Sequence, residues 1–280
     1  GSVVDLAPAA TVRAILHGYL GGEAGAGAMA ELLYGDANPS GKLAESYPRA
    51  LSDTPAYPYR KLRGNRAEYR ESIYVGYRYY DKAKVPLRYP FGFGLSYTRF
   101  AYEELRISET GVRFRLRNTG SRAGAEIAEL YICAAESEIF RPEKELKGFA
   151  KVFLQVGEEK EVCIPFDDKS FRVFDSVANR FLEESGRYRI LIGASAADIR
   201  LNGELVRAGE KLCRADEKKR LPHYFSGAAQ QIGRAEFGRL LGRKLERHPI
   251  AGELLRGDAL HELRRSRGLL ARMLYRQLRR

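Results

Sequence analysis

The stretch from Arg88 to Thr98 reads RYPFGFGLSYT, and it bears more on the expected fold than any other part of the chain. Two glycines alternate with aromatic residues in it, so the backbone must bend tightly while large rings pack around it. The stretch closes a tyrosine-dense segment that begins at Tyr69 and ends at Tyr97. Local chemistry alone predicts an ordered connection held together by aromatic packing.

Downstream of this stretch the hydrophobic pattern changes to that of β-strands. Val112, Phe114 and Leu116 alternate with arginines, which is the pattern of a half-buried strand. Further strand patterns follow over residues 128–133, 149–154, 162–166, 171–174 and 188–192. About seven short strands over roughly 110 residues predict an immunoglobulin-like sandwich.

Upstream, residues 9–34 have apolar positions at helical spacing, with Pro8 at the start and a break at Gly21-Gly22. We expect a helix there, then a turn over 35–41 and a surface connection over 42–68. Residues 25–30, GAGAMA, match the spacing of a dinucleotide-binding fingerprint. That motif must follow a strand, whereas a helix is expected before it, so close helix–sheet packing is the preferred interpretation.

The C-terminal part is strongly basic: residues 214–280 carry +10 of the net charge of +12. Two amphipathic helices are expected, one with a stripe of Phe237, Leu240, Leu241 and Leu245, and one with a stripe of Leu260, Leu263, Leu270, Met273, Leu274 and Leu278. A basic amphipathic helix can bind membranes or nucleic acid. The second helix has only Tyr275 as an aromatic residue, so we expect its leucines to dock on the protein itself or on a homodimer partner, with no nucleic acid and no membrane as partner.

Several classes of function are not expected. The chain has no run of 18 apolar residues, no secretory signal and no initiator Met, which predicts a cytoplasmic piece of a longer protein. Cys133, Cys163 and Cys213 lack metal-ligand spacing and are expected to be reduced and mostly buried; a disulfide between the first two is not favoured. The four histidines are scattered, so neither a metal site nor a cofactor is expected.

Several phrases of the sequence together resemble one enzyme family. They are LLYGDANPSGKL over 32–43, IYVGYRYYD over 73–81, YPFGFGLSY over 89–97, RNTG over 117–120 and ELKGF over 145–149. They are similar to the C-terminal portion of family 3 glycoside hydrolases, which include β-glucosidases. The resemblance implies an α+β multidomain chain: the end of an α/β-sandwich domain over 1–99, a fibronectin type III-like β-sandwich over 100–213 and an α-helical extension over 214–280.

The resemblance also implies a reaction and says where its catalytic groups lie. Members hydrolyse terminal β-linked sugars by a retaining mechanism that needs two carboxylates. The family's nucleophilic Asp lies on an N-terminal barrel, and its acid/base Glu lies upstream of the segment that opens this chain. We therefore assign no catalytic residue here and expect the isolated chain to be structural and inactive. The alternative is a non-catalytic carbohydrate-binding or protein-interaction module.

Four residues of the tyrosine-rich segment are candidates for a sugar-binding rim: Glu71, Tyr77, Arg78 and Asp81. Tyrosine rings can stack on sugar faces, and charged side chains can bind hydroxyl groups of a β-linked oligosaccharide. The alternative, which we favour, is that Arg78 pairs with Asp81 while the tyrosines fasten this segment to the following domain.

Overall fold

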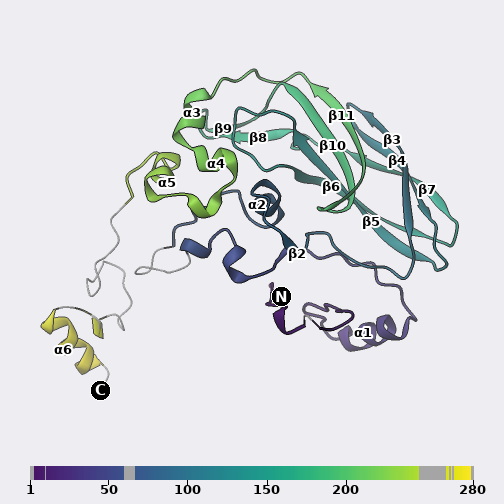
Figure 1. Cartoon of the computed structure of the whole chain (residues 1–280), viewed down its shortest axis with the longest axis horizontal. Helices are drawn as coiled ribbons and strands as arrows, with labels where there is room; N and C mark the ends of the chain where they lie inside the picture. The colour runs from purple at the N-terminus through teal and green to yellow at the C-terminus, as the bar shows by residue number, and fades with distance from the viewer. Residues whose placement is uncertain are drawn as a thin grey trace.

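The computed structural model describes residues 3–9, 11–59, 67–245, 263–264, 266 and 268–278. A β-sandwich forms most of the body, and the N-terminal segment and the C-terminal helices lie beside it (Figure 1). The sandwich was predicted from the alternation of apolar and charged residues, and it is confirmed. No helix among the described residues has the length and apolar character needed to cross a bilayer.

The sandwich consists of two antiparallel sheets. One has the strand order β11-β10-β5-β6 and the other β3-β4-β7. The strands are β3 (Phe100–Ser108), β4 (Gly111–Asn118), β5 (Gly124–Ala134), β6 (Glu145–Leu154), β7 (Glu159–Pro165), β10 (Gly186–Ser195) and β11 (Asp198–Arg207). A separate hairpin pairs β8 (Arg172–Asp175) with β9 (Arg180–Glu183).

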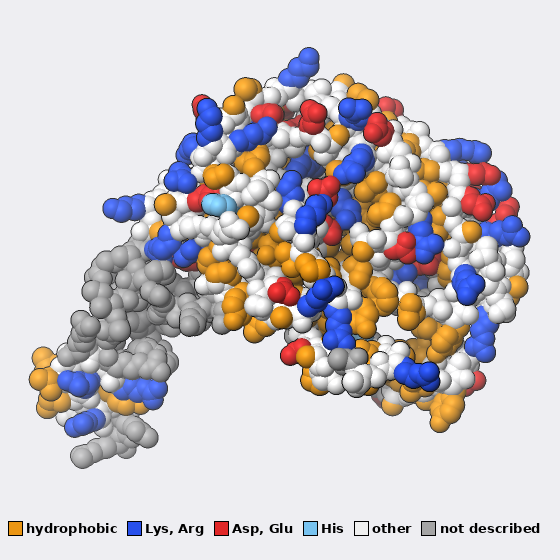
Figure 2. Space-filling model, viewed as in Figure 1, with side chains coloured by type: hydrophobic (Ala, Val, Ile, Leu, Met, Phe, Trp, Pro, Cys, Tyr) orange, Lys and Arg blue, Asp and Glu red, His pale blue; other side chains and the backbone are white. Residues whose placement is uncertain are grey.

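The core lies between the two sheets. Val112, Phe114 and Leu116 of β4 point inward and are at most 1% exposed, while the intervening Arg113 and Arg117 are exposed. Leu130, Ile190 and other inward residues of the facing sheet pack against them. Lys, Arg, Asp and Glu side chains are interspersed over the outer surface of the sandwich in the view of Figure 2.

The described residues among the first hundred contain less regular structure than the sequence predicts. Their elements are the 3-10 turns η1 (Ala7–Ala9), η2 (Leu51–Asp53) and η3 (Tyr57–Tyr59), the helices α1 (Gly25–Tyr34) and α2 (Tyr77–Lys82), and the strand pair β1 (Tyr47–Pro48) and β2 (Leu87–Tyr89). The connection expected over 42–68 thus contributes a strand, in which Tyr47 is only 3% exposed.

The helix expected over 9–34 is confirmed only for α1. Residues 11–24 are not helical, and apolar members of the expected stripe such as Val12 and Leu20 are exposed. Three glycines lower the helix propensity there, and Tyr19 has a left-handed φ of 46°, which a helix cannot contain. The expected close packing of the GAGAMA glycines is also wrong, because a Cβ at Gly25 or Gly27 would meet nothing within 4 Å.

The helical extension contains α3 (Ala215–Arg220), α4 (Pro222–Ser226), η4 (Ala229–Gln231), α5 (Arg234–Leu240) and α6 (Leu269–Leu278). Phe237 of the first expected stripe is buried, and Leu240 and Leu245 pack against the same core. Most of the second stripe lies on α6, where Leu270 is 84% exposed; Leu260 lies outside the described residues. All three cysteines are free as expected, but only Cys133 is buried.

Candidate functional site

The tyrosine-rich segment lies between the sandwich and the helical extension, and its helix α2 buries three tyrosines. The hydroxyl oxygen of Tyr77 accepts a hydrogen bond from the backbone N–H of Leu146 on β6, at 2.8 Å. Its ring centroid lies 5.1 Å from that of Phe91 and 5.8 Å from that of Tyr131 on β5. Burial raises the pKa of Tyr77, so its hydroxyl stays neutral. Tyr77 therefore fastens the segment to the sandwich.

Asp81 forms an ion pair across the same boundary. Its carboxylate lies 2.6 Å from Nζ of Lys144, on the connection between β5 and β6. Burial raises the pKa of Asp81 and outweighs the opposing effect of Lys144. We expected Asp81 to pair with Arg78, and this is wrong, because the ion-pair partner of Asp81 is Lys144. The Arg78 guanidinium carbon lies 5.9 Å from the Tyr77 ring centroid, and its buried Nε has no hydrogen-bond partner among the described residues.

Glu71 lies in a different environment from the other three candidates. It is 7% exposed, and its Oε2 has no hydrogen-bond partner within the described part of the chain. Burial raises the pKa of this carboxyl. Its neighbours in sequence, Arg70 and Tyr74, both donate hydrogen bonds to backbone carbonyls of the helical extension. The structure therefore groups Tyr77 and Asp81 at the sandwich boundary and places Glu71 next to the extension.

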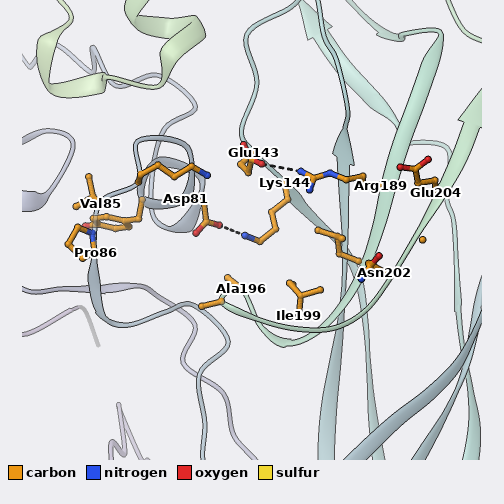
Figure 3. A pocket seen from close by; sticks show the side chains of 15 residues that line it. Asp81, Val85, Pro86, Glu143, Lys144, Arg189, Ala196, Ile199, Asn202 and Glu204 are labelled. Atoms are coloured by element: carbon orange, nitrogen blue, oxygen red, sulfur yellow. Dashed lines mark hydrogen bonds and ion pairs between the residues drawn. The ribbon is translucent and has the colours of Figure 1, made fainter.

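A polar groove opens where α2 meets the sandwich, with a volume of about 760 Å³. Two ion pairs lie along it, Asp81 with Lys144 and Glu143 with Arg189, the latter at 3.0 Å (Figure 3). Val85 and Pro86 lie on one side, and Asn202 and Glu204 of β11 on the other. Its charged lining groups are three acids and three bases: Asp81, Glu143, Glu204, Lys84, Lys144 and Arg189. The lining of the groove is therefore electrically balanced.

The PFGFG stretch crosses the outer face of the sandwich. A Cβ on Gly92, whose φ is +79°, would lie 2.4 Å from both carboxylate oxygens of Glu129 on β5. Glu129 is 4% exposed and accepts a hydrogen bond of 2.6 Å from the Tyr131 hydroxyl. A Cβ on Gly94 would lie 2.4 Å from the carbonyl oxygen of Gly41. Both glycines are required by close approach, in agreement with the tight backbone that the sequence predicts.

The NPSGKL phrase meets the same face from the other side. Nζ of Lys42 lies 2.8 Å from the Glu126 carboxylate and donates to the carbonyl of Ala194 at 3.0 Å. The Asn38 amide donates to the Ala123 carbonyl, and its oxygen accepts from the backbone N–H of Tyr97 at 2.8 Å. Sequence reasoning missed these contacts as a group. The Gly, Asn, Pro and Ser residues over 35–41 are typical of any turn and gave no signal of these contacts.

The acids of this junction are engaged in structural contacts. Glu126 pairs with Lys42, and Glu129 lies beneath the backbone of Gly92 with Tyr131 bonded to it. A nucleophile and a general acid must instead reach the scissile bond of a sugar from both sides. Within the described ranges no group of three or more His, Cys, Asp or Glu could hold a metal ion. The geometry around the PFGFG stretch is that of a domain junction.

Comparison with known proteins agrees with this geometry. The family model for the glycosyl hydrolase family 3 C-terminal domain matches residues 1–97, and that for the fibronectin type III-like domain matches residues 126–196. Thermostable beta-glucosidase B of Acetivibrio thermocellus is 43% identical over 207 residues, which are 71% of this chain and 27% of that protein. An exo-alpha-(1->6)-L-arabinopyranosidase of Bifidobacterium breve is 38% identical over 205 residues, again 71% of this chain and 27% of the relative.

A solved structure matches the whole chain. The GH3 beta-glucosidase of Bifidobacterium adolescentis superposes with a TM-score of 0.71 and 28% identity over 100% of this chain and 36% of its own. The chain thus spans about a quarter of the length of the curated relatives named above. On these matches and on the junction that its motifs build, the chain belongs to glycoside hydrolase family 3 and corresponds to the C-terminal part of its β-glucosidases.

Proposed function

We propose that the protein to which this chain belongs hydrolyses terminal β-linked sugars, most simply β-glucosides, with retention of anomeric configuration. The observation that carries the proposal is the 43% identity over 207 residues to a β-glucosidase, together with a fold match over the whole chain. In this proposal the two catalytic carboxylates belong to other parts of the protein. The present chain braces the sugar-binding domain through the sandwich.

Sugar identity is proposed to be decided outside this chain. A β-glucosidase and an arabinopyranosidase resemble it over nearly the same length and to nearly the same degree. A region shared between relatives that act on different sugars is a scaffold more readily than a specificity pocket. This supports a bracing role for the junction.

Glu71, Tyr77, Arg78 and Asp81 stay a proposed sugar-binding rim. Glu71 and Arg78 are the members with hydrogen-bonding capacity left, because Oε2 of Glu71 and Nε of Arg78 have no partner among the described residues. Tyr77 and Asp81 already bond to the sandwich. A Glu71→Gln change in the longer protein should raise the KM for an aryl β-glucoside severalfold, whereas an unchanged KM would remove Glu71 from the rim.

The proposed partners are a β-linked oligosaccharide and a second copy of the protein, with neither nucleic acid nor membrane. The exposed leucines of α6 support a docking partner for that helix. A cytoplasmic location is proposed as well, supported by three free cysteines.

The reaction is tested with the longer protein that contains this chain. Purified protein is incubated with an aryl β-glucoside while proton NMR follows the anomer released first. We expect β-glucose before mutarotation. Release of α-glucose would contradict the retaining mechanism, and binding of glucosides without hydrolysis would favour the interaction module that the sequence left as the alternative.

A further inference from the structure

The helical extension packs on the tyrosine-rich segment through a core of its own. Tyr74 of the segment and Tyr224 of α4 are fully buried against each other, and Ile232 is 1% exposed. The two matched domain ranges end at residues 97 and 196, so α3 to α5 lie beyond both of them. Figure 1 shows these green helices beside the blue segment that leads into α2.

Residues 229–230 of the extension contact residues 52–59, which precede the tyrosine-rich segment in the chain. The Tyr59 hydroxyl donates to the Ala229 carbonyl at 2.7 Å. The Gln230 amide donates to the carbonyls of Ser52 and Thr54, at 2.7 and 2.9 Å. Burial raises the pKa of Tyr59 to about 12, so its hydroxyl remains a donor at neutral pH.

The same face of the extension contacts the start of the tyrosine-rich segment, at Arg70 and Tyr74. The Tyr224 hydroxyl donates to the Arg70 carbonyl at 2.9 Å, and the Tyr74 hydroxyl donates to the Tyr224 carbonyl in return. The Arg70 guanidinium donates to the Ile232 carbonyl at 3.2 Å. Because most of these bonds end on backbone carbonyls, they fix the path of the main chain as well as side-chain positions.

The extension is tied to the sandwich by a different kind of contact. Arg214 pairs with Asp175 at 2.6 Å, and Lys218 pairs with Glu138 at 2.7 Å. Lys218 and Glu138 are partly solvent-exposed, so their pair is screened by water and salt. The sandwich also contributes Phe140, whose ring centroid lies 5.1 Å from that of Tyr224. Ion pairs near the start of the extension thus anchor it on the sandwich. Its buried face packs against the tyrosine-rich segment.

We propose that residues 221–234 act as a positioning clamp, which holds segments 52–59 and 68–74 together and thereby sets the orientation of Glu71. The clamp rests on the proposed function only in that Glu71 is a proposed rim residue. Tyr224, Gln230 and Ile232 are its positioning residues and touch no substrate themselves. Glu71 follows Arg70 directly, so any movement of the Arg70 carbonyl displaces the Glu71 backbone.

The test uses the full 280-residue chain and hydrogen–deuterium exchange read by mass spectrometry. Tyr224→Phe removes one buried hydroxyl and leaves the ring in place. We expect amide exchange over 67–76 to become about fivefold faster, since a neutral hydrogen bond contributes on the order of a fivefold change in an opening equilibrium. Exchange over β10, residues 186–195, should not change.

Tyr188→Phe is the matched control, because the buried Tyr188 hydroxyl donates to the Glu184 carbonyl at 2.9 Å within the sandwich. It should speed exchange near residues 184–195 and leave 67–76 unchanged. Gln230→Ala should act on 52–59 in the same way as Tyr224→Phe acts on 67–76. If Tyr224→Phe accelerates exchange equally over 67–76 and over 186–195, the clamp is refuted and Tyr224 contributes only general stability. If it accelerates exchange in neither region, the clamp is refuted as well.

A second readout separates the clamp from the proposed reaction. In the longer protein, Tyr224→Phe should raise the KM for an aryl β-glucoside by a similar factor and leave kcat unchanged, with Tyr188→Phe as control. If the longer protein hydrolyses no glucoside, the proposed function fails while the exchange result still stands. If hydrolysis occurs and KM is unaffected although exchange rises, the clamp does not reach the sugar.

Discussion

Gly92→Ala is the most informative single change at the domain junction. The new Cβ would lie 2.4 Å from each carboxylate oxygen of Glu129 and 2.7 Å from its carboxyl carbon. The buried carboxylate must move and loses its 2.6 Å bond from the Tyr131 hydroxyl. A left-handed alanine costs about 1–2 kcal/mol, and a displaced buried acceptor costs about 1–3 kcal/mol more. We expect the unfolding free energy to fall by about 2–5 kcal/mol in total.

Gly157→Ala is the matched control. Gly157 has a φ of +77°, close to the +79° of Gly92, but a Cβ there would meet nothing within 4 Å. It should cost only the backbone part, about 1–2 kcal/mol. Urea unfolding followed by tyrosine fluorescence measures both variants, since the chain has 17 Tyr and no Trp. Equal losses in the two variants would refute the claim that the PFGFG stretch is shaped by contact with Glu129.

Three further perturbations probe the junction and the tail. Burial raises the pKa of Glu129 in the folded chain. Its carboxyl therefore contributes fully to stability at a pH below the ordinary carboxyl pKa, and this contribution is lost as pH rises through the raised pKa of the folded state. The wild-type chain should therefore lose stability relative to Glu129→Gln as pH rises from about 4 towards neutrality, and parallel melting curves would contradict this. Asp81→Asn should destabilise the chain by about 1–3 kcal/mol, because it leaves Lys144 buried without its counter-charge. The double variant Asp81→Asn/Lys144→Met should recover part of that loss, and strict additivity in urea unfolding would count against the pair. Leu270→Asp with Leu274→Asp should shift sedimentation towards the monomer if a second copy covers α6, whereas an unchanged profile would exclude α6 from a dimer interface.

The sandwich could be predicted from sequence because its signal is local. Val112, Phe114 and Leu116 face the core while the arginines between them face solvent, and this period of two is visible in one strand alone. Strand β11 was missed because Gly203 interrupts its inward-facing apolar positions and polar residues lie on either side. The helix expected over residues 11–24 is wrong, because the apolar spacing there did not reveal the left-handed backbone at Tyr19.

The junction contacts could not be predicted, because each joins residues far apart in the chain. Lys42 and Glu126 carry no pattern that marks them as a pair, and neither do Asp81 and Lys144. Lys42 and Asp81 lie on phrases through which the family was identified, whereas Glu126 and Lys144 lie on none of them. The grip of the extension on Arg70 and Tyr74 depends on buried tyrosine hydroxyls, whose targets are backbone carbonyls with no sequence signature at all.

We infer that this chain is a scaffold whose acids serve structure. The most direct measurement is the hydrolysis of an aryl β-glucoside by the purified 280-residue chain, at micromolar protein over several hours and across pH 5–7. We predict no product above the protein-free control. Turnover that scales with protein concentration and disappears in Glu71→Gln or Asp81→Asn would contradict it, because a catalytic carboxylate would then lie within this chain.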